Sequence, residues 1–211
     1  MAKIKMVLTD MDGSAVRYKN QPFNSGWDAI GDSLPPEIRK KWYETRDYYY
    51  PRKELYSDWF NTQCRLLTGL NLNTVEKKVF PVPYAPGFLE FFAQLNPEII
   101  TGLISSGVDL IANRVRQEAA LDIVVCNKLH TNNGVFTGTG EEIVGLWSKT
   151  VFLEQISKKT GIPLEQICYI GDSENDIDVL KAVGRPYIIN PHPNVKGLAP
   201  EIKDYREIKL D

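Results

Sequence analysis

The sequence predicts an α/β fold, a doubly wound, Rossmann-like parallel sheet core with a helical cap module inserted after the first strand. From residue 84 onward, apolar runs of strand length alternate with longer segments of helical spacing, which is typical of a parallel sheet with helices on both faces. Two of the apolar runs end in acidic clusters, at residues 10–12 and 172–176. Residues 15–83 interrupt the alternation, because they are polar and aromatic and contain no convincing buried strand.

The core strands are expected to be short apolar runs bounded by turn residues. These runs lie at about 4–10, 99–105, 122–126, 167–171 and 186–190. Segments with helical spacing fit between them at about 87–95, 108–119, 148–160 and 173–183. The last two helices are each followed by a glycine and a proline within three residues, which are helix stop signals.

Two further elements depart from this alternation. Residues 132–134, Asn-Asn-Gly, predict the tight turn of a hairpin between 128–131 and 135–137. Residues 15–83 have helical spacing around 36–49 and 54–67 and end in a proline-rich connector. We therefore expect a core domain of residues 1–14 and 84–211 and a helical cap domain of residues 15–83. The chain would cross between them near 14–20 and 80–86, which predicts a hinge.

The composition argues against several classes of function. The 211 residues carry a net charge of -2, which gives no field to attract nucleic acid or an anionic membrane. Cys64, Cys126 and Cys168 have no metal-ligand spacing, and two of them lie in apolar runs where we expect buried thiols. The N-terminal apolar run is too short for a signal peptide or a membrane span, so we expect a cytoplasmic protein.

The first acidic cluster, Asp10-Met11-Asp12, follows the first predicted strand. Side chains alternate along a strand, so Asp10 would point into the crevice at the carboxyl end of the sheet, with Asp12 curling over the same spot. Taken alone, the pair is also an ordinary turn sequence. The cluster at 172–176 repeats the arrangement after another strand, so together they could hold a cation and attack a phosphorus.

The order of these features along the chain is specific. An acid pair is followed by Ser105-Ser106-Gly107 at the end of a third apolar strand, then by Lys149 near the start of a helical stretch, then by the second acidic cluster. This order resembles the haloacid dehalogenase superfamily of aspartate-nucleophile phosphohydrolases. Segments 66–87, 104–109, 127–138 and 149–176 look most similar to its phosphoserine phosphatase group.

The resemblance implies roles for the acids and the lysine. Asp10 would be the nucleophile that forms an aspartyl-phosphate, and its carboxylate would also bind Mg²⁺. Asp12 would protonate the leaving group and then deprotonate water, while its backbone carbonyl contacts the metal. Lys149 would neutralise Asp10 and the phosphoryl group, and Asp172 would complete the protein's share of the metal ligands.

The same resemblance implies phosphate-binding and supporting residues. Ser105 would donate a hydrogen bond to a phosphoryl oxygen, and the amides of Ser106 and Gly107, at the opening of the next helix, would bind another. Asn175 and Asp176 would hold metal ligands, waters or the lysine in place. Each residue alone has a structural alternative, since serines cap helices and a lone lysine is usually solvated. His130 and His192 have no partners at ligand spacing and receive no role.

The cap region bears on the substrate. Its aromatic residues would form the core of a small module or close over the substrate, with Tyr56 and Trp59 as first candidates for contact. Phosphoserine phosphatases bind serine with a glutamate shortly after the first motif and an arginine in a later cap helix. The corresponding positions here fall near Lys19 or Asn20 and near Gln63, so the glutamate is missing.

We therefore expect a magnesium-dependent phosphatase that hydrolyses small phosphorylated metabolites through an aspartyl-phosphate, as a monomer or homodimer. Phosphoserine phosphatase proper is the alternative within the same chemistry, followed by a phosphomutase. Alternatives from other classes are a phospho-accepting signalling domain and a ligand-binding relative without activity. Asp12 counts against the signalling domain, because a signalling aspartyl-phosphate must persist.

Overall fold

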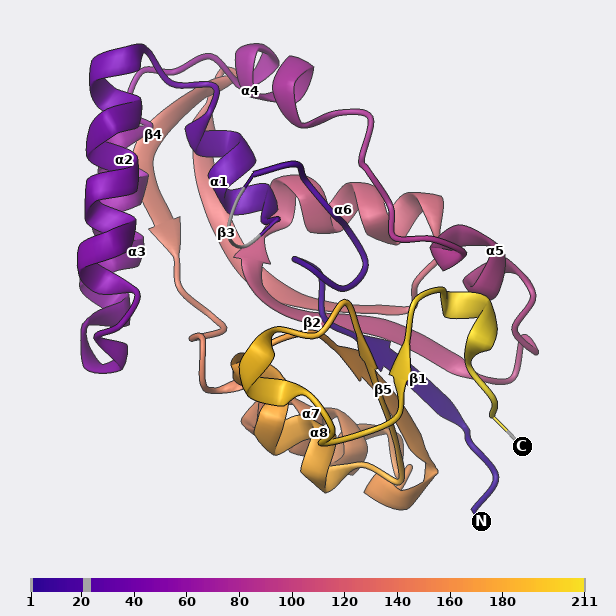
Figure 1. The fold of residues 1–211 in the computed structure, drawn as a ribbon. Coiled ribbons are helices and arrows are strands. Elements are labelled where there is room, and N and C mark those ends of the chain that lie inside the picture. Colours follow the sequence, from indigo (N-terminus) through magenta and orange to yellow (C-terminus); the bar gives the residue numbers. More distant parts are fainter. Residues whose placement is uncertain (1, 21–23, 211) are drawn as a thin grey trace.

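The computed structural model describes residues 2–20 and 24–210 and contains one seven-stranded sheet (Figure 1). The strand order is β4-β3-β2-β1-β5-β6-β7, and every pair is parallel except β3 with β4. The strands are β1 (Met6–Thr9), β2 (Ile100–Val108), β3 (Ile123–Asn132), β4 (Val135–Glu141), β5 (Ile167–Gly171), β6 (Arg185–Ile189) and β7 (Glu201–Ile202).

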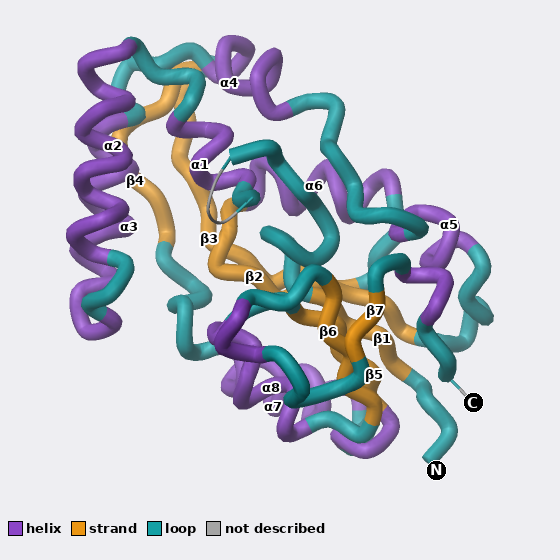
Figure 2. Tube along the Cα trace, viewed as in Figure 1, coloured by secondary structure: helices purple, strands orange, loops and turns teal. Residues whose placement is uncertain are grey.

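The sheet is covered on both faces because its strand residues are apolar on both sides. In β1, Val7 belongs to one hydrophobic cluster, while Met6 and Leu8 belong to another. The first cluster includes residues of α5 (Phe88–Ala93) and α6 (Asp109–Glu118), and the second includes residues of α7 (Lys149–Thr160) and α8 (Ile177–Ala182). Figure 2 shows these two pairs of helices on opposite sides of the strands, which confirms the doubly wound core.

The segment between β1 and α5 is helical. It contains α1 (Gly26–Gly31), α2 (Pro36–Tyr49), α3 (Tyr56–Leu66) and α4 (Leu72–Val79). Helices α2 and α3 pack side by side, and α1 packs against α4. Short 3-10 turns lie at Lys53–Leu55, Leu164–Gln166, Glu174–Asp176, Pro193–Val195 and Tyr205–Glu207.

The β3–β4 hairpin reaches out of the sheet and runs alongside α3 (Figure 1). Three backbone hydrogen bonds join β4 and its turn to the α3–α4 connection. The Gly69 N–H donates to the Phe136 carbonyl at 3.0 Å, the Phe136 N–H to Leu70 at 2.9 Å, and the Leu72 N–H to Gly134 at 2.8 Å. The outer edge of β4 is therefore paired with the helical segment.

The predicted elements agree with the structure except at particular ends. Strand β2 continues to Val108, because its pairing with β3 resumes at Asn127 after an irregularity. The residues 105–107 therefore lie within a strand, and the next helix begins only at Asp109. The predicted 173–183 helix begins with the 3-10 turn at 174–176, and α1, α4 and β7 were not predicted.

The three cysteines are free and buried, whereas burial was expected for two of them. Among the described residues, no helix combines the length and the apolar character needed to cross a bilayer.

Candidate active site

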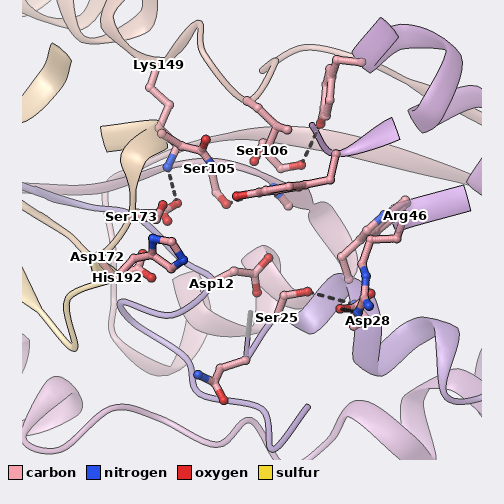
Figure 3. Close-up of a pocket in the computed structure, with 18 of the residues that line it drawn as sticks. Asp12, Ser25, Asp28, Arg46, Ser105, Ser106, Lys149, Asp172, Ser173 and His192 are labelled. Atoms are coloured by element: carbon pink, nitrogen blue, oxygen red, sulfur yellow. Dashed lines mark hydrogen bonds and ion pairs between the residues drawn. The ribbon is translucent and has the colours of Figure 1, made fainter. Parts of the chain in front are cut away.

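The predicted site residues of the core converge at the carboxyl ends of three neighbouring strands. Asp10 follows β1, Ser105 lies late in β2, and Asp172 follows β5, with β1 central among the three. Lys149, the first residue of α7, joins them. These four residues line a cavity of about 280 Å³, whose opposite wall comes from the helical segment (Figure 3).

A chain of hydrogen bonds links the nucleophile candidate to the interior. The Lys149 Nζ lies 2.9 Å from the Asp10 Oδ1 and 2.7 Å from the Asp176 Oδ1. The Tyr169 hydroxyl donates to the same oxygen of Asp176 at 2.7 Å. All four side chains are buried, so the ammonium group is held between two carboxylates with little exposure to solvent.

This environment changes the proton affinities of the groups. Burial raises the pKa of Asp10 to about 6, even though Lys149 acts in the opposite direction. Burial alone would lower the pKa of Lys149, but the carboxylates of Asp10 and Asp176 raise it above its usual value. The lysine is therefore charged at neutral pH and is available to offset negative charge on a phosphoryl group.

Asp12 is held by the start of α1. Its Oδ1 accepts a hydrogen bond of 2.6 Å from the backbone N–H of Gly26. Burial raises the pKa of Asp12 to about 7, the Gly26 hydrogen bond opposes this, and the charge of Asp10 adds to it. A carboxyl group with such a pKa can both give and take a proton near neutral pH.

The Ser105–Gly107 segment lines the cavity from the strand rather than from a helix N-terminus, which corrects the prediction. The Gly107 N–H donates to the Ser105 hydroxyl at 3.0 Å. A Cβ at Gly107 would lie 2.3 Å from the Met11 Cε and 2.9 Å from the Asp12 Oδ2, so a larger residue there would displace these side chains. The Ser106 carbonyl accepts a hydrogen bond from Asn127 at 2.8 Å, which fixes the segment to β3.

The acidic residues offer oxygen ligands to a cation. Carboxylate oxygens of Asp10, Asp172 and Asp176 lie within 4.8 Å of one another. The carboxylate of Asp176 is already engaged by Lys149, Tyr169 and two backbone N–H groups, which leaves Asp10 and Asp172 as ligands.

The surroundings of Asp172 oppose a negative charge on its carboxyl group. Burial, followed by the charge of Asp10, raises its pKa well above the usual value. Its Oδ1 accepts a hydrogen bond from the Ser14 hydroxyl at 3.1 Å. Gly13, at a φ of +81°, passes so close that a Cβ would lie 2.2 Å from the Asp172 Oδ2. A hard divalent cation such as Mg²⁺ fits these oxygen donors and would offset their charge.

Asn175 lines the cavity, but its side chain reaches towards the helical segment. Burial raises the pKa of Tyr50 to about 12, and a hydrogen bond with the Asn175 side chain opposes this shift. Tyr50 follows α2, so this contact joins the two walls of the cavity.

Of the three cap candidates, two line the cavity and one does not. Tyr56 and Trp59 face it from the start of α3. Gln63 is instead buried within the helical segment and lies outside the cavity lining. Its Oε1 accepts a hydrogen bond from the Trp27 Nε1, and its Nε2 donates to the Trp42 carbonyl at 3.3 Å. Gln63 therefore supports the cavity wall rather than forming it.

The sequence analysis missed several lining residues. Trp27, Asp28 and Arg46 line the cavity, and the Arg46 Nη1 donates to the Asp28 Oδ2 at 2.9 Å. His192 also lines it, because its backbone N–H donates to the Asp172 carbonyl at 2.8 Å. Asp28 and Arg46 are 18 positions apart on different helices, and His192 arrives from the loop after β6. No spacing along the chain signals either arrangement.

Comparison with known proteins gives consistent similarities. A family model described as haloacid dehalogenase-like hydrolase matches residues 14–181. The phosphoserine phosphatase of Methanocaldococcus jannaschii is 28% identical over 213 residues, which cover 98% of this chain and 96% of that protein. The phosphoserine phosphatase of Idiomarina loihiensis is 32% identical over 146 residues, covering 68% of this chain and 66% of the relative.

Solved structures are similar over almost the whole chain. A phosphoserine phosphatase in the form of a phospho-aspartyl intermediate analogue aligns with a TM-score of 0.79 and 26% identity, over 98% of both chains. A substrate-bound phosphoserine phosphatase complex aligns with a TM-score of 0.79 and 25% identity, over 99% of this chain and 98% of that one.

Proposed function

The chain belongs to the haloacid dehalogenase-like hydrolase family, and from that membership we propose that it is a magnesium-dependent phosphomonoester phosphatase of small metabolites. The observation that carries the proposal is the buried contact of 2.9 Å between Asp10 and Lys149 at the carboxyl end of the sheet, with Asp12 lining the same cavity. The cavity of about 280 Å³ supports a small substrate.

In the first step, a carboxylate oxygen of Asp10 attacks the phosphorus of the ester. The bond from phosphorus to the ester oxygen breaks, and Asp12 gives its proton to the departing alkoxide. Lys149 reduces the repulsion between the Asp10 carboxylate and the phosphoryl oxygens. The products of this step are a free alcohol and an aspartyl-phosphate on Asp10.

In the second step, water attacks the phosphorus of the aspartyl-phosphate. Asp12, now ionised, takes a proton from that water, and the bond between phosphorus and the Asp10 oxygen breaks. Inorganic phosphate leaves, Asp10 is a carboxylate again, and Asp12 is again protonated. The pKa of Asp12, raised to about 7, supports both of its roles.

Binding of the phosphoryl group falls to the end of β2 and to the metal ligands. The Ser105 hydroxyl and the backbone amide of Ser106 would donate to phosphoryl oxygens, while the Gly107 N–H, which donates to the Ser105 hydroxyl, would orient that hydroxyl. Asp10, Asp172 and the backbone carbonyl of Asp12 would hold Mg²⁺, which when bound supplies positive charge against those oxygens. Asp176 positions Lys149 through its contact of 2.7 Å.

We assign a different role to each of the two modules. Residues 1–14 and 84–211 supply the catalytic groups, and residues 15–83 act as a cap that excludes bulk water during phosphoryl transfer. Tyr56 and Trp59, which line the cavity, are the proposed cap contacts to substrate. Phosphoserine phosphatase activity proper is the second candidate, because the similarity to phosphoserine phosphatases extends over nearly the whole chain.

The test is phosphate release from para-nitrophenyl phosphate and a panel of phosphorylated metabolites in Mg²⁺, with phosphoserine included. We expect turnover that is lost in Asp10→Asn and falls by about 10²–10⁴-fold in Asp12→Asn. Chelation of Mg²⁺ should abolish turnover, and adding it back should restore it. Turnover that persists in Asp10→Asn would refute the mechanism, and a stable phosphoprotein without phosphate release would favour the signalling alternative.

A further inference from the structure

The cavity has chemically different ends. Figure 3 shows Lys149 and Asp172 on one side and the Asp28–Arg46 pair on the other, with Asp12 and Ser25 between them. All six residues line the same cavity. A substrate whose phosphoryl group lies against Asp10 would therefore extend its leaving group into the half of the cavity that the cap surrounds.

One wall of this half is a rigid set of aromatic rings. The Trp59 ring lies between Tyr50 and Tyr56, with ring centroids 6.0 and 5.9 Å apart and interplanar angles of 88° and 86°. Tyr56 is tied to the core, because the Asn127 Nδ2 donates to its hydroxyl at 3.0 Å and that hydroxyl donates to the Ser106 carbonyl at 3.3 Å. The rings are therefore held in place before a ligand arrives.

Flat apolar surfaces continue around the cavity. Trp27 and Phe60 are stacked with centroids 6.0 Å apart and an angle of 12°, and both line it. Leu146 adds an apolar side chain from the core. Trp59 is 7% exposed, so its ring is largely enclosed by its neighbours.

The charges at the far end neutralise each other. The Arg46 guanidinium donates to the Asp28 Oδ2 at 2.9 Å and contacts the Asp47 Oδ1 at 2.8 Å. The other oxygen of Asp28 accepts a hydrogen bond from the Trp42 Nε1 at 3.3 Å. A zwitterion such as serine would have to break these contacts to find partners for its own charges, and breaking a buried ion pair is costly.

We propose that the natural leaving group is an uncharged alcohol with a planar aromatic or heteroaromatic ring, bound against Tyr50, Tyr56 and Trp59. This proposal rests on the phosphatase function proposed above and names the substrate class of the same site. Ring faces and edges favour a planar leaving group. The Asp28–Arg46 ion pair, whose charges already offset each other, disfavours a leaving group that carries charge.

The test compares three phosphate esters of primary alcohols, so that the reacting bond is similar in each. Benzyl phosphate carries a neutral ring, n-propyl phosphate a neutral chain, and phosphoserine a zwitterion. We expect kcat/KM in Mg²⁺ to be at least about tenfold higher for benzyl phosphate than for n-propyl phosphate, and phosphoserine to be the poorest of the three.

Variants locate the preference on the aromatic wall. Trp59→Leu should lower the ratio of kcat/KM for benzyl over n-propyl phosphate by about tenfold, whereas Trp59→Phe should keep most of it. Trp147→Leu is the matched control, because the Trp147 Nε1, like that of Trp59, is buried with no partner among the described residues, but Trp147 lies outside the cavity lining. This control should leave the ratio unchanged.

Three results would overturn the inference or a part of it, and they differ in what else they affect. A preference for phosphoserine over benzyl phosphate would reject the neutral aromatic leaving group while leaving the phosphatase function intact. Failure of all three esters and of para-nitrophenyl phosphate in Mg²⁺ would reject the phosphatase function and the inference together. A benzyl preference that survives Trp59→Leu would reject the assigned wall.

Discussion

Tyr169 carries a hydroxyl into the apolar interior of the protein, where it meets the carboxylate of Asp176. The same Asp176 oxygen contacts Lys149, and Lys149 contacts Asp10. A residue that touches no substrate therefore helps to fix the position of the lysine. Tyr169 is a positioning residue rather than a catalytic one.

Tyr169→Phe should lower kcat by about threefold to tenfold with little change in KM, because it removes one hydrogen bond that positions Asp176. The free energy of unfolding should fall by about 1–3 kcal/mol, the range for a buried polar group that loses its partner. Steady-state kinetics and denaturant unfolding measure the two effects.

Tyr187→Phe provides the matched control. The Tyr187 side chain is buried, and its hydroxyl donates to the carbonyl of the exposed Lys209 at 2.9 Å, away from the site. This variant should lose stability and keep its kcat. Equal kcat values for Tyr169→Phe and the unmodified enzyme would exclude the positioning role.

At the scale of elements, α1 connects the cap to the chemistry. The helix is only six residues long, and its first backbone N–H, from Gly26, donates to Asp12. A Cβ at Gly26 would lie 2.3 Å from the Ile111 Cδ1, so α1 can approach this closely only with glycine at its start. The position of the cap helix and the orientation of Asp12 are therefore linked.

Gly26→Ala should displace α1 and break the hydrogen bond to Asp12, with a loss of about tenfold to 100-fold in kcat. Gly145→Ala is the control, because its nearest contact would be the Ser148 Oγ at 3.4 Å, an ordinary distance. Kinetics of both variants, with melting curves to verify folding, measure the effect. A fully active Gly26→Ala enzyme would contradict the link.

The elements also explain what the sequence could and could not predict. Strand β5 and helix α2 match their predicted bounds, because β5 is a continuous buried apolar run and α2 lies between prolines, with Pro36 in its first turn and Pro51 just after its end. Strands β2 and β3 run past their apolar residues because pairing continues through polar ones, which periodicity does not detect. Helices α1 and α4, of six and eight residues, are too short to give a clear period.

The candidate site also has one half that the sequence could predict and one half that it could not. Its core half was predictable, since parallel strands bring their carboxyl ends to one edge, and Asp10, Ser105 and Asp172 each lie at such an end. The cap half was not, because the approach of Asp28 to Arg46 depends on how α1 packs near α2. That packing is decided by tertiary contacts such as the Trp42 ring, which leaves no room for a Cβ at Gly31.

At the scale of the whole molecule, the site brings several carboxyl groups together with little positive charge to offset them. Burial raises the pKa of Asp10 to about 6 and of Asp12 to about 7, and raises that of Asp172 as well. In an unfolded chain such groups release their protons near about pH 4. Between about pH 4 and about pH 7, the metal-free folded protein therefore binds more protons at these carboxyl groups than the unfolded chain does.

The unfolding free energy of the metal-free protein should thus be greatest in mild acid and decline as the pH rises through about 6 to 7. Each extra proton in the folded state contributes a slope of about 1.4 kcal/mol per pH unit. Saturating Mg²⁺ should flatten this decline, because the ion stabilises the ionised carboxylates. Denaturant unfolding between pH 5 and pH 8, in EDTA and in Mg²⁺, measures both curves. Identical curves would argue against a metal site at these acids.

The hairpin formed by β3 and β4 also limits how the cap could be exchanged for that of another protein. An exchange of cap domains designed from the order of the chain alone would replace residues 15–83 and nothing else. Such an exchange would remove Gly69, Leu70 and Leu72, whose backbones are hydrogen-bonded to Phe136 and Gly134 of the hairpin. A functional graft would have to transfer the hairpin with the helices, so the transplantable piece is discontinuous in sequence.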